Sequence, residues 1–280
     1  MTTMPPIVSI DDLADHPDAV IVDVRWYLDG RDARAAYESG HLPGAVFVDL
    51  EHDLSTPLKS PDAGRHPFPE PEAFAAAMSS LGIGDDSIVI AYDDTGGMTA
   101  GRLVVMLRMI GRNAAVLEGG IGLWQGQLMQ GPGVIPEHLD FTPCEWPLDR
   151  LADADEVIAV AASEHGLVLD ARSHDRFTGE VTQIDPRPGH VPGASSAPWA
   201  DNLDPETHRF RPAAELRERF NALGVSASDS VITYCGSGVS ACMNILAMEQ
   251  AGLPPARLYV ASFSGWSADP DRPVELGPER

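Results

Sequence analysis

Two stretches of the chain repeat one another: GIGDDSIVIAYDD at residues 82–94 and GVSASDSVITYCG at residues 224–236. In each copy a run of β-branched and apolar residues follows a polar turn, which is typical of a buried strand. The pairing extends outward through VIVDVRW and LVLDARS, then GHLPGAVF and GHVPGASS, and finally GGIGLW and SFSGW. Because the partners keep the same order at offsets of 142–149 residues, the chain contains a duplicated domain and not a short solenoid repeat.

Each copy alternates short apolar strands with helical patterns. In the first copy we predict strands at 21–24 and 88–92 and helices at 72–81 and 100–110. Near-continuous apolar strands between helices indicate a mainly parallel sheet with helices on both faces. We therefore expect an α/β chain of two tandem domains, at residues 1–130 and 151–280. The proline-rich stretch at 131–150, which contains Cys144, is the expected linker.

Composition limits the classes of partner. The chain has 280 residues and a formal net charge of −23, which argues against nucleic acid and anionic membranes as partners. No signal peptide and no apolar run of about 18 residues is visible. Three cysteines, Cys144, Cys235 and Cys242, form no disulfide framework and no zinc pattern. We expect a cytoplasmic protein without a metal or an organic cofactor.

Cys235 stands where a predicted strand ends and a loop of very small residues leads into a predicted helix. In open α/β sheets, ligands bind at this edge. Successive main-chain N–H groups and the helix dipole favour an anion there, and they lower the pKa of a thiol. The second copy alone has the thiol, because Asp93 occupies the matching position of the first copy. We therefore predict that Cys235 is a nucleophile and that Cys242, further into the helix, is a core residue.

The repeat, GHLPGA/GHVPGA and CGSGVSA resemble the two-domain rhodanese sulfurtransferases over essentially the whole chain, and most closely the 3-mercaptopyruvate type. Ser240 stands where that type usually has Thr. Thiosulfate-type members have basic residues directly after the cysteine, whereas Gly236 and Ser237 are neutral here. The resemblance implies a Cys235 persulfide, 3-mercaptopyruvate as the sulfur donor, and cyanide or a thiol such as thioredoxin as the acceptor. It also implies a catalytically silent first domain.

The same resemblance implies roles for individual residues. Arg176 and Arg187 match arginines that bind the donor, and a forked guanidinium suits a planar 2-oxo acid. Ser237 matches a serine that helps to activate the donor or the thiolate, with a His and an Asp of the first domain as partners. His41 and Asp32 are the candidates for these partners, although His190 repeats His41 and suggests a structural role. The remaining residues that we expect to contact the substrate are those of the loop: Gly236, Gly238, Val239, Ser240 and Ala241.

Some assignments favour structure over function. Arg172 and Arg25 repeat each other after a strand and are assigned to the fold. Ser240 is also a candidate N-cap of the following helix. The glycines of EGGIGLWQG do not have nucleotide-loop spacing, so we expect a turn before a helix that packs Trp124.

Three alternatives remain open. The first is thiosulfate as the donor, with the same persulfide chemistry. The second is a phosphatase or arsenate reductase of the same fold, although such a loop needs an Arg where Ala241 stands. The third is a non-catalytic, protein-binding module.

Overall fold

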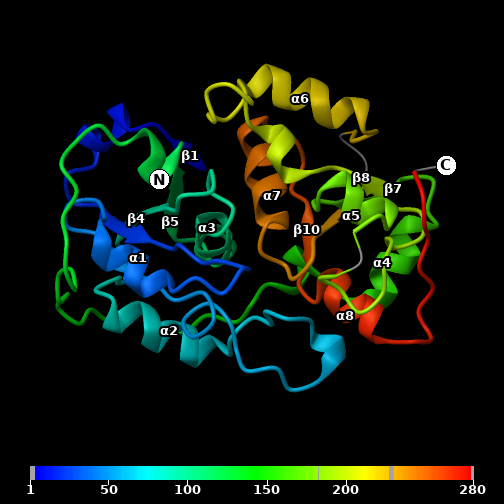
Figure 1. The fold of residues 1–280 in the computed structure, drawn as a ribbon, viewed down its shortest axis with the longest axis horizontal. Coiled ribbons are helices and arrows are strands. Elements are labelled where there is room, and N and C mark those ends of the chain that lie inside the picture. Colours follow the sequence, from blue (N-terminus) through cyan, green and yellow to red (C-terminus); the bar gives the residue numbers. More distant parts are fainter. Residues whose placement is uncertain (1–3, 182, 227–229, 279–280) are drawn as a thin grey trace. The chain divides into compact units, whose positions relative to one another are not determined.

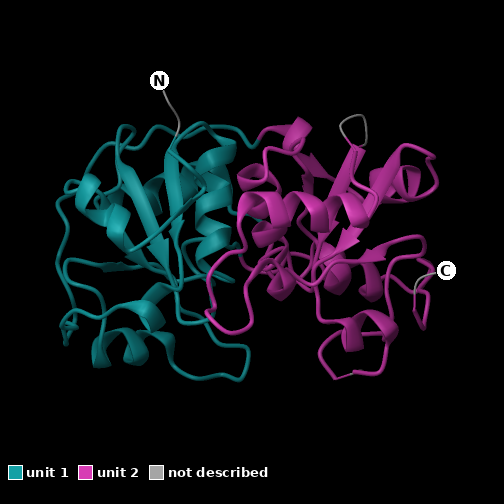
Figure 2. Cartoon of the chain, turned by 90° about the horizontal axis from the view of Figure 1, so that it is seen from above, with its two compact units in different colours: residues 1–56, 68–146 teal, residues 57–67, 147–280 magenta. Residues whose placement is uncertain are grey.

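The computed structural model describes residues 4–181, 183–226 and 230–278. The chain forms two compact units (Figure 2). Unit 1 holds the chain up to Thr56 and the segment Phe68–Trp146, and unit 2 holds Pro57–Pro67 and the chain from Pro147 onward. The expected linker at 131–150 is therefore divided, since its residues up to Trp146 belong to unit 1.

Unit 1 is built on a parallel sheet of five strands in the order β1-β5-β4-β2-β3. Figure 1 labels three of them, β1, β4 and β5. Its strands are β1 (Ile7–Val8), β2 (Val20–Asp23), β3 (Val46–Phe47), β4 (Ile88–Tyr92) and β5 (Asn113–Leu117). Its α-helices are α1 (Ala33–Ser39), α2 (Pro71–Ser80) and α3 (Ala100–Met109), and its 3₁₀ helices are η1 (Asp11–Asp15) and η3 (Gly120–Leu123). The predicted strands and helices of this copy are confirmed to within a residue at each end.

Unit 2 repeats this arrangement with the strand order β6-β10-β9-β7-β8. Its strands are β6 (Leu151–Ala152), β7 (Gly166–Asp170), β8 (Ser195–Ser196), β9 (Ser230–Tyr234) and β10 (Arg257–Tyr259). Its α-helices are α4 (Ala154–Ala161), α5 (His174–Thr178), α6 (Ala213–Ala222), α7 (Ala241–Gln250) and α8 (Ser262–Ala268). The 3₁₀ helices are η2 (Pro61–Ala63), η4 (Leu148–Arg150) and η5 (Trp199–Asn202).

Successive side chains of a strand point to opposite faces of the sheet, so both faces can pack against helices. In unit 2, Ile232 and Tyr234 of β9 share a buried cluster with residues of α4, α5 and α8. Helix α7 packs against β9 and β10, and α6 packs against α7. The predicted duplicated α/β fold is confirmed. No helix in the described ranges is long and apolar enough to cross a membrane.

In each unit a buried Asp–Arg ion pair lies at the end of the second strand. Arg25 donates to both carboxylate oxygens of Asp23 and to the carbonyl of Gly40. Arg172 makes the same contacts with Asp170 and the carbonyl of Gly189. Each pair ties a strand end to the loop that begins GH-x-PGA, so the structural assignment of both arginines agrees with their contacts.

The glycine-rich stretch before Trp124 forms a single 3₁₀ turn, η3. Trp124 packs against the core of unit 1. Its counterpart Trp266 lies in α8 and is almost fully buried. Trp124 therefore packs as the sequence suggested, but the helix expected after the turn is only this 3₁₀ turn.

The segment Pro57–Pro67 belongs to unit 2 although it lies in the first half of the sequence. The main-chain N–H of Arg65 donates to Ser264 Oγ in α8. Glycine is required at position 265, because a Cβ there would lie 2.5 Å from the carbonyl oxygen of Asp62. This close contact holds the segment against the helix that follows β10.

We expect that Arg25→Met lowers the free energy of unfolding by about 3–5 kcal/mol, since it leaves the buried Asp23 carboxylate unpaired. Urea unfolding followed by circular dichroism measures the loss. Arg31→Met is the matched control, because the side chain of Arg31 is 64% exposed in its pair with Asp29 and such pairs contribute under about 1 kcal/mol. Equal losses in the two variants would contradict the structural role of the buried pair.

Candidate active site

Cys235 lies directly after β9, on the loop that leads into α7. Its main-chain N–H donates to Ser262 Oγ at 3.1 Å, and its carbonyl accepts from Phe263 N at 2.9 Å. The carbonyl of Gly236 accepts from Ser264 N at 2.9 Å. The loop is thus fixed to the start of α8, where Ser262 has a φ of 53°. Such left-handed backbone is uncommon for a residue other than glycine and is found at functional sites.

The loop forms a cradle around the sulfur, which we define by Ser237, Val239, Ser240 and Ala241. Burial alone would raise the pKa of the Cys235 thiol. Hydrogen bonds from the Ser240 hydroxyl and from the main-chain N–H groups of Ser237, Ala241 and Val239 outweigh burial, so the pKa lies below its ordinary value. The thiolate is the reactive form of a cysteine, and the arrangement therefore supports a nucleophile.

Ser240 does not have the capping role that the sequence suggested. Its side chain makes no cap hydrogen bond to α7, because the hydroxyl interacts with the sulfur of Cys235. Gly238 has a φ of 72°, a conformation that favours glycine. Cys242 is fully buried in α7, as expected of a core residue, and its thiol donates to the carbonyl of Gly238.

Unit 1 contains the same cradle, and a carboxylate fills it. Asp93 accepts hydrogen bonds of 2.8 Å from the N–H groups of Thr95, Gly97 and Thr99. These residues stand two, four and six positions after Asp93, as Ser237, Val239 and Ala241 stand after Cys235. The Thr99 hydroxyl and Ala100 N–H also donate to this carboxylate, at 3.0 Å. The anion-binding geometry is therefore common to both units, but unit 2 places a thiol in it where unit 1 has a carboxylate.

The hydroxyl of Ser237 is joined to Nδ1 of His66 by a hydrogen bond of 2.9 Å. His66 is 3% exposed and lies in the segment Pro57–Pro67 of the same unit. Sequence reasoning missed this histidine because it has no counterpart in the second copy. A signal was present: the repeat offset falls from 149 at Gly40 to 142 at Tyr92, so the first copy has extra residues in this region.

The two residues suggested as partners of Ser237 are engaged elsewhere, within unit 1. Nδ1 of His41 is 2.9 Å from the carbonyl oxygen of Tyr37, and the two rings stack. His190 makes the same contacts with Phe177 in unit 2. The repeated histidine is therefore a packing residue, and the observed partner of Ser237 is His66.

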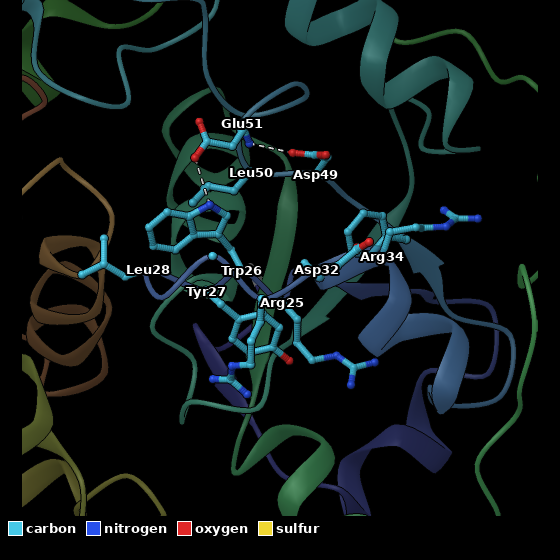
Figure 3. Close-up of a pocket in the computed structure, with 13 residues that line it drawn as sticks. Arg25, Trp26, Tyr27, Leu28, Asp32, Arg34, Asp49, Leu50 and Glu51 are labelled. Carbon is cyan, nitrogen blue, oxygen red and sulfur yellow. Dashed lines mark hydrogen bonds between the residues drawn. The ribbon is translucent and has the colours of Figure 1, made fainter.

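Asp32 accepts from the N–H of Ala35 and caps α1. It lines a pocket of about 420 Å³ in unit 1, which Figure 3 shows together with Trp26 and Glu51. The indole N–H of Trp26 donates to the carboxylate of Glu51. Arginines in the pocket wall pair with carboxylates, as Arg34 does with Glu38. These contacts account for the charges of the pocket, so it gives no support to a catalytic Asp32.

The structure places Arg176 and Arg187, the two arginines expected to bind the donor, in different surroundings. Two Nη atoms of Arg176 lie against Gly236, where a Cβ would be 2.7 and 3.4 Å from them. Arg187 instead donates to the carbonyls of Ser267 and Asp269 at the end of α8. The second guanidinium against Gly236 is that of Arg65, which sequence reasoning did not identify.

The site contains no grouping of metal ligands. Within the described ranges, no three His, Cys, Asp or Glu side chains gather in a way that could hold a metal ion. What the site offers is a thiol with a lowered pKa, main-chain donors, a Ser–His pair and two guanidinium groups. This set is suited to covalent transfer from an anionic donor.

Comparison with known proteins gives a consistent assignment. Residues 9–127 and 153–269 match the family described as the rhodanese-like domain. A probable 3-mercaptopyruvate sulfurtransferase of Pseudomonas aeruginosa is 39% identical over 274 residues, which is 94% of each chain. A putative thiosulfate sulfurtransferase, SseB, of Mycobacterium tuberculosis is 36% identical and covers 92% of this chain and 90% of its own. The structure of SseA, a 3-mercaptopyruvate sulfotransferase of Escherichia coli, has a TM-score of 0.79 at 33% identity and covers 92% of this chain and 99% of its own.

We expect Ser240→Ala to raise the pKa of the Cys235 thiol, because the thiolate loses a hydrogen bond and remains buried. The rate at which iodoacetamide alkylates Cys235 rises with pH as the thiol ionises. At pH values below that transition the rate should fall about 10-fold in the variant, since a hydrogen bond to a charged group contributes about 1.5 kcal/mol or more. Mass spectrometry locates the adduct on Cys235 as a function of pH. Ser240→Thr is the control and should keep the original inflection. Identical profiles for the Ala and Thr variants would show that the hydroxyl does not stabilise the thiolate.

Proposed function

The chain belongs to the rhodanese family of sulfurtransferases, and on that premise we propose that it takes sulfane sulfur from 3-mercaptopyruvate and carries it as a persulfide of Cys235. The observation that carries this proposal is the cradle. Its main-chain donors favour the thiolate before the transfer and can hold the terminal sulfur of the persulfide after it. The cradle of unit 1 is occupied by Asp93, which supports a catalytically silent first unit.

The first half of the reaction forms one bond and breaks another. The Cys235 thiolate attacks the sulfur of 3-mercaptopyruvate, an S–S bond forms, and the C–S bond breaks. The bonding pair passes to carbon, so that pyruvate leaves as its enolate and is then protonated by the acidic persulfide. The hydroxyl of Ser237, held by His66, can donate a hydrogen bond to the donor's carbonyl oxygen as negative charge develops there.

In the second half, an acceptor takes the outer sulfur and Cys235 returns to the thiolate. We propose a thiol, such as that of thioredoxin, or cyanide as the acceptor. The transfer is therefore divided into two steps that use the same sulfur atom of the protein. A cytoplasmic location and the absence of a cofactor remain predictions from the sequence.

Thiosulfate is the second candidate donor, because one of the relatives bears that name. The residues after Cys235 are neutral, but Arg65 and Arg176 lie beside Gly236. Cations are therefore available to either donor, and the ratio of kcat/KM for the two donors distinguishes them. A higher kcat/KM for thiosulfate than for 3-mercaptopyruvate would reject our choice of donor.

The other two alternatives have less support. A phosphatase needs an arginine at position 241, and Ala241 there is fully buried at the start of α7. A non-catalytic module has no need of a thiol with a lowered pKa, which Cys235 has. The phosphatase therefore lacks the arginine that would bind its phosphate, and the non-catalytic module leaves the cysteine in its cradle without a function.

Incubation with 3-mercaptopyruvate should add one sulfur, about 32 Da, to the peptide that contains Cys235, as expected of a reactive thiolate. Cys235→Ser should gain no sulfur and lose turnover, and Cys242→Ser should keep both. Intact mass and peptide mass spectrometry provide the measurement. Normal turnover by Cys235→Ser would overturn the persulfide route.

We also expect His66→Ala to lower kcat with 3-mercaptopyruvate by about 100-fold, because Ser237 loses the partner that orients its hydroxyl toward the developing negative charge. Turnover of thiosulfate, which forms no enolate, should fall less. His52→Ala is the control, because that side chain is 83% exposed. Equal losses with the two donors would contradict a role for the Ser237–His66 pair at the donor's carbonyl oxygen.

A further inference from the structure

One carboxylate in unit 2 binds three arginines. Asp185 is 2.8 Å from Arg65 Nη1, 2.6 Å from Arg176 Nη2 and 3.3 Å from Arg172 Nη1. Its side chain is 7% exposed. Arg172 is already paired with Asp170, so Asp185 mainly neutralises and orients Arg65 and Arg176.

Those two arginines converge on the residue that follows the nucleophile. A Cβ at Gly236 would lie 2.7 Å from Nη2 of Arg65 and 2.7 Å from Nη2 of Arg176. Because both atoms lie that close to one point, the guanidinium groups are neighbours above the loop. The absence of a side chain at Gly236 is what allows them to approach it.

Both guanidinium groups retain donors without acceptors. The Nε atoms of Arg65 and Arg176 are buried and have no hydrogen-bond partner within the described part of the chain. Buried donors are normally satisfied. The two guanidinium groups therefore keep hydrogen-bonding capacity that the described part of the chain does not use.

The charges of this group leave a small positive excess. Arg65 and Arg176 carry two positive charges, and Asp185 removes one of them. Burial would raise the pKa of the Asp185 carboxyl, but the charges and hydrogen bonds of Arg176 and Arg65 hold it below its ordinary value. Asp185 is therefore ionised at neutral pH, and the pair of arginines matches one negative charge better than two.

We propose that Asp185 is a positioning residue that selects the donor by charge: it orients Arg65 and Arg176 over Gly236 and limits their net charge to the single carboxylate of a 2-oxo acid. Arg65 is then a donor-binding residue together with Arg176. The inference rests on the proposed sulfur transfer and adds to it a reason for preferring a monoanionic donor to dianionic thiosulfate.

The test compares kcat/KM for 3-mercaptopyruvate and thiosulfate, with cyanide as the acceptor for both. In Asp185→Asn the ratio of thiosulfate to 3-mercaptopyruvate should rise about 10-fold, because the isosteric change adds one unit of positive charge beside the donor. Asp185→Glu keeps the charge and should keep the ratio near its original value. Asp175→Asn is the matched control, since its exposed carboxylate accepts from the main-chain N–H of Arg176 and lies outside the group of three arginines.

Equal changes for both donors in Asp185→Asn would overturn the proposal and show a structural role only. If that variant does not fold, Arg65→Gln provides the measurement. It should raise KM for 3-mercaptopyruvate about 10-fold, and Arg65→Lys should give an intermediate KM. At saturating donor, Cys235 should still be fully loaded with sulfur in both variants. An unchanged KM would also overturn the proposal.

Failure of the proposed function is distinguishable from failure of this inference. If the unaltered protein gains no sulfur on Cys235 from either donor, the sulfur transfer itself is wrong. If it gains sulfur and the donor ratio does not respond to Asp185→Asn, only the role of Asp185 is wrong.

Discussion

Burial and hydrogen bonding compete at the sulfur of Cys235, and the site depends on the second effect prevailing. A buried thiolate without donors would take up a proton and lose its reactivity. Main-chain N–H groups at every second residue of the loop oppose this protonation and lower the pKa of the thiol, with the hydroxyl of Ser240 as a fourth donor. These donors come from the backbone, so the site relies on loop geometry, which β9, α7 and the start of α8 hold in place.

Much of this could be predicted from the sequence, because the features concerned are local. The strands and helices follow from hydrophobic patterning, and the duplication follows from the ordered repeat of short motifs. The position of Cys235 follows from a strand, a run of small residues and a helix in succession. Even the contrast between Asp93 and Cys235 is visible once the two copies are aligned.

The rest could not be predicted, because it depends on where a segment packs. His66 and Arg65 lie in the first half of the sequence, among prolines with no clear periodicity, and yet they belong to unit 2. Arg187 lies close to Arg176 in sequence, but its guanidinium binds the end of α8. Neighbouring positions on a loop do not fix the direction of a long side chain, and only the packed structure reveals it.

The resident carboxylate of Asp93 has a consequence for stoichiometry. A cradle of five donors that is already satisfied by its own chain has no capacity for a guest anion, whatever the supply of sulfur. Duplication of the domain therefore did not double the number of sulfur atoms that the chain can carry. By the proposed route, each polypeptide holds one transferable sulfur atom in a cradle of this kind, and a second donor molecule must wait until the first sulfur has been delivered.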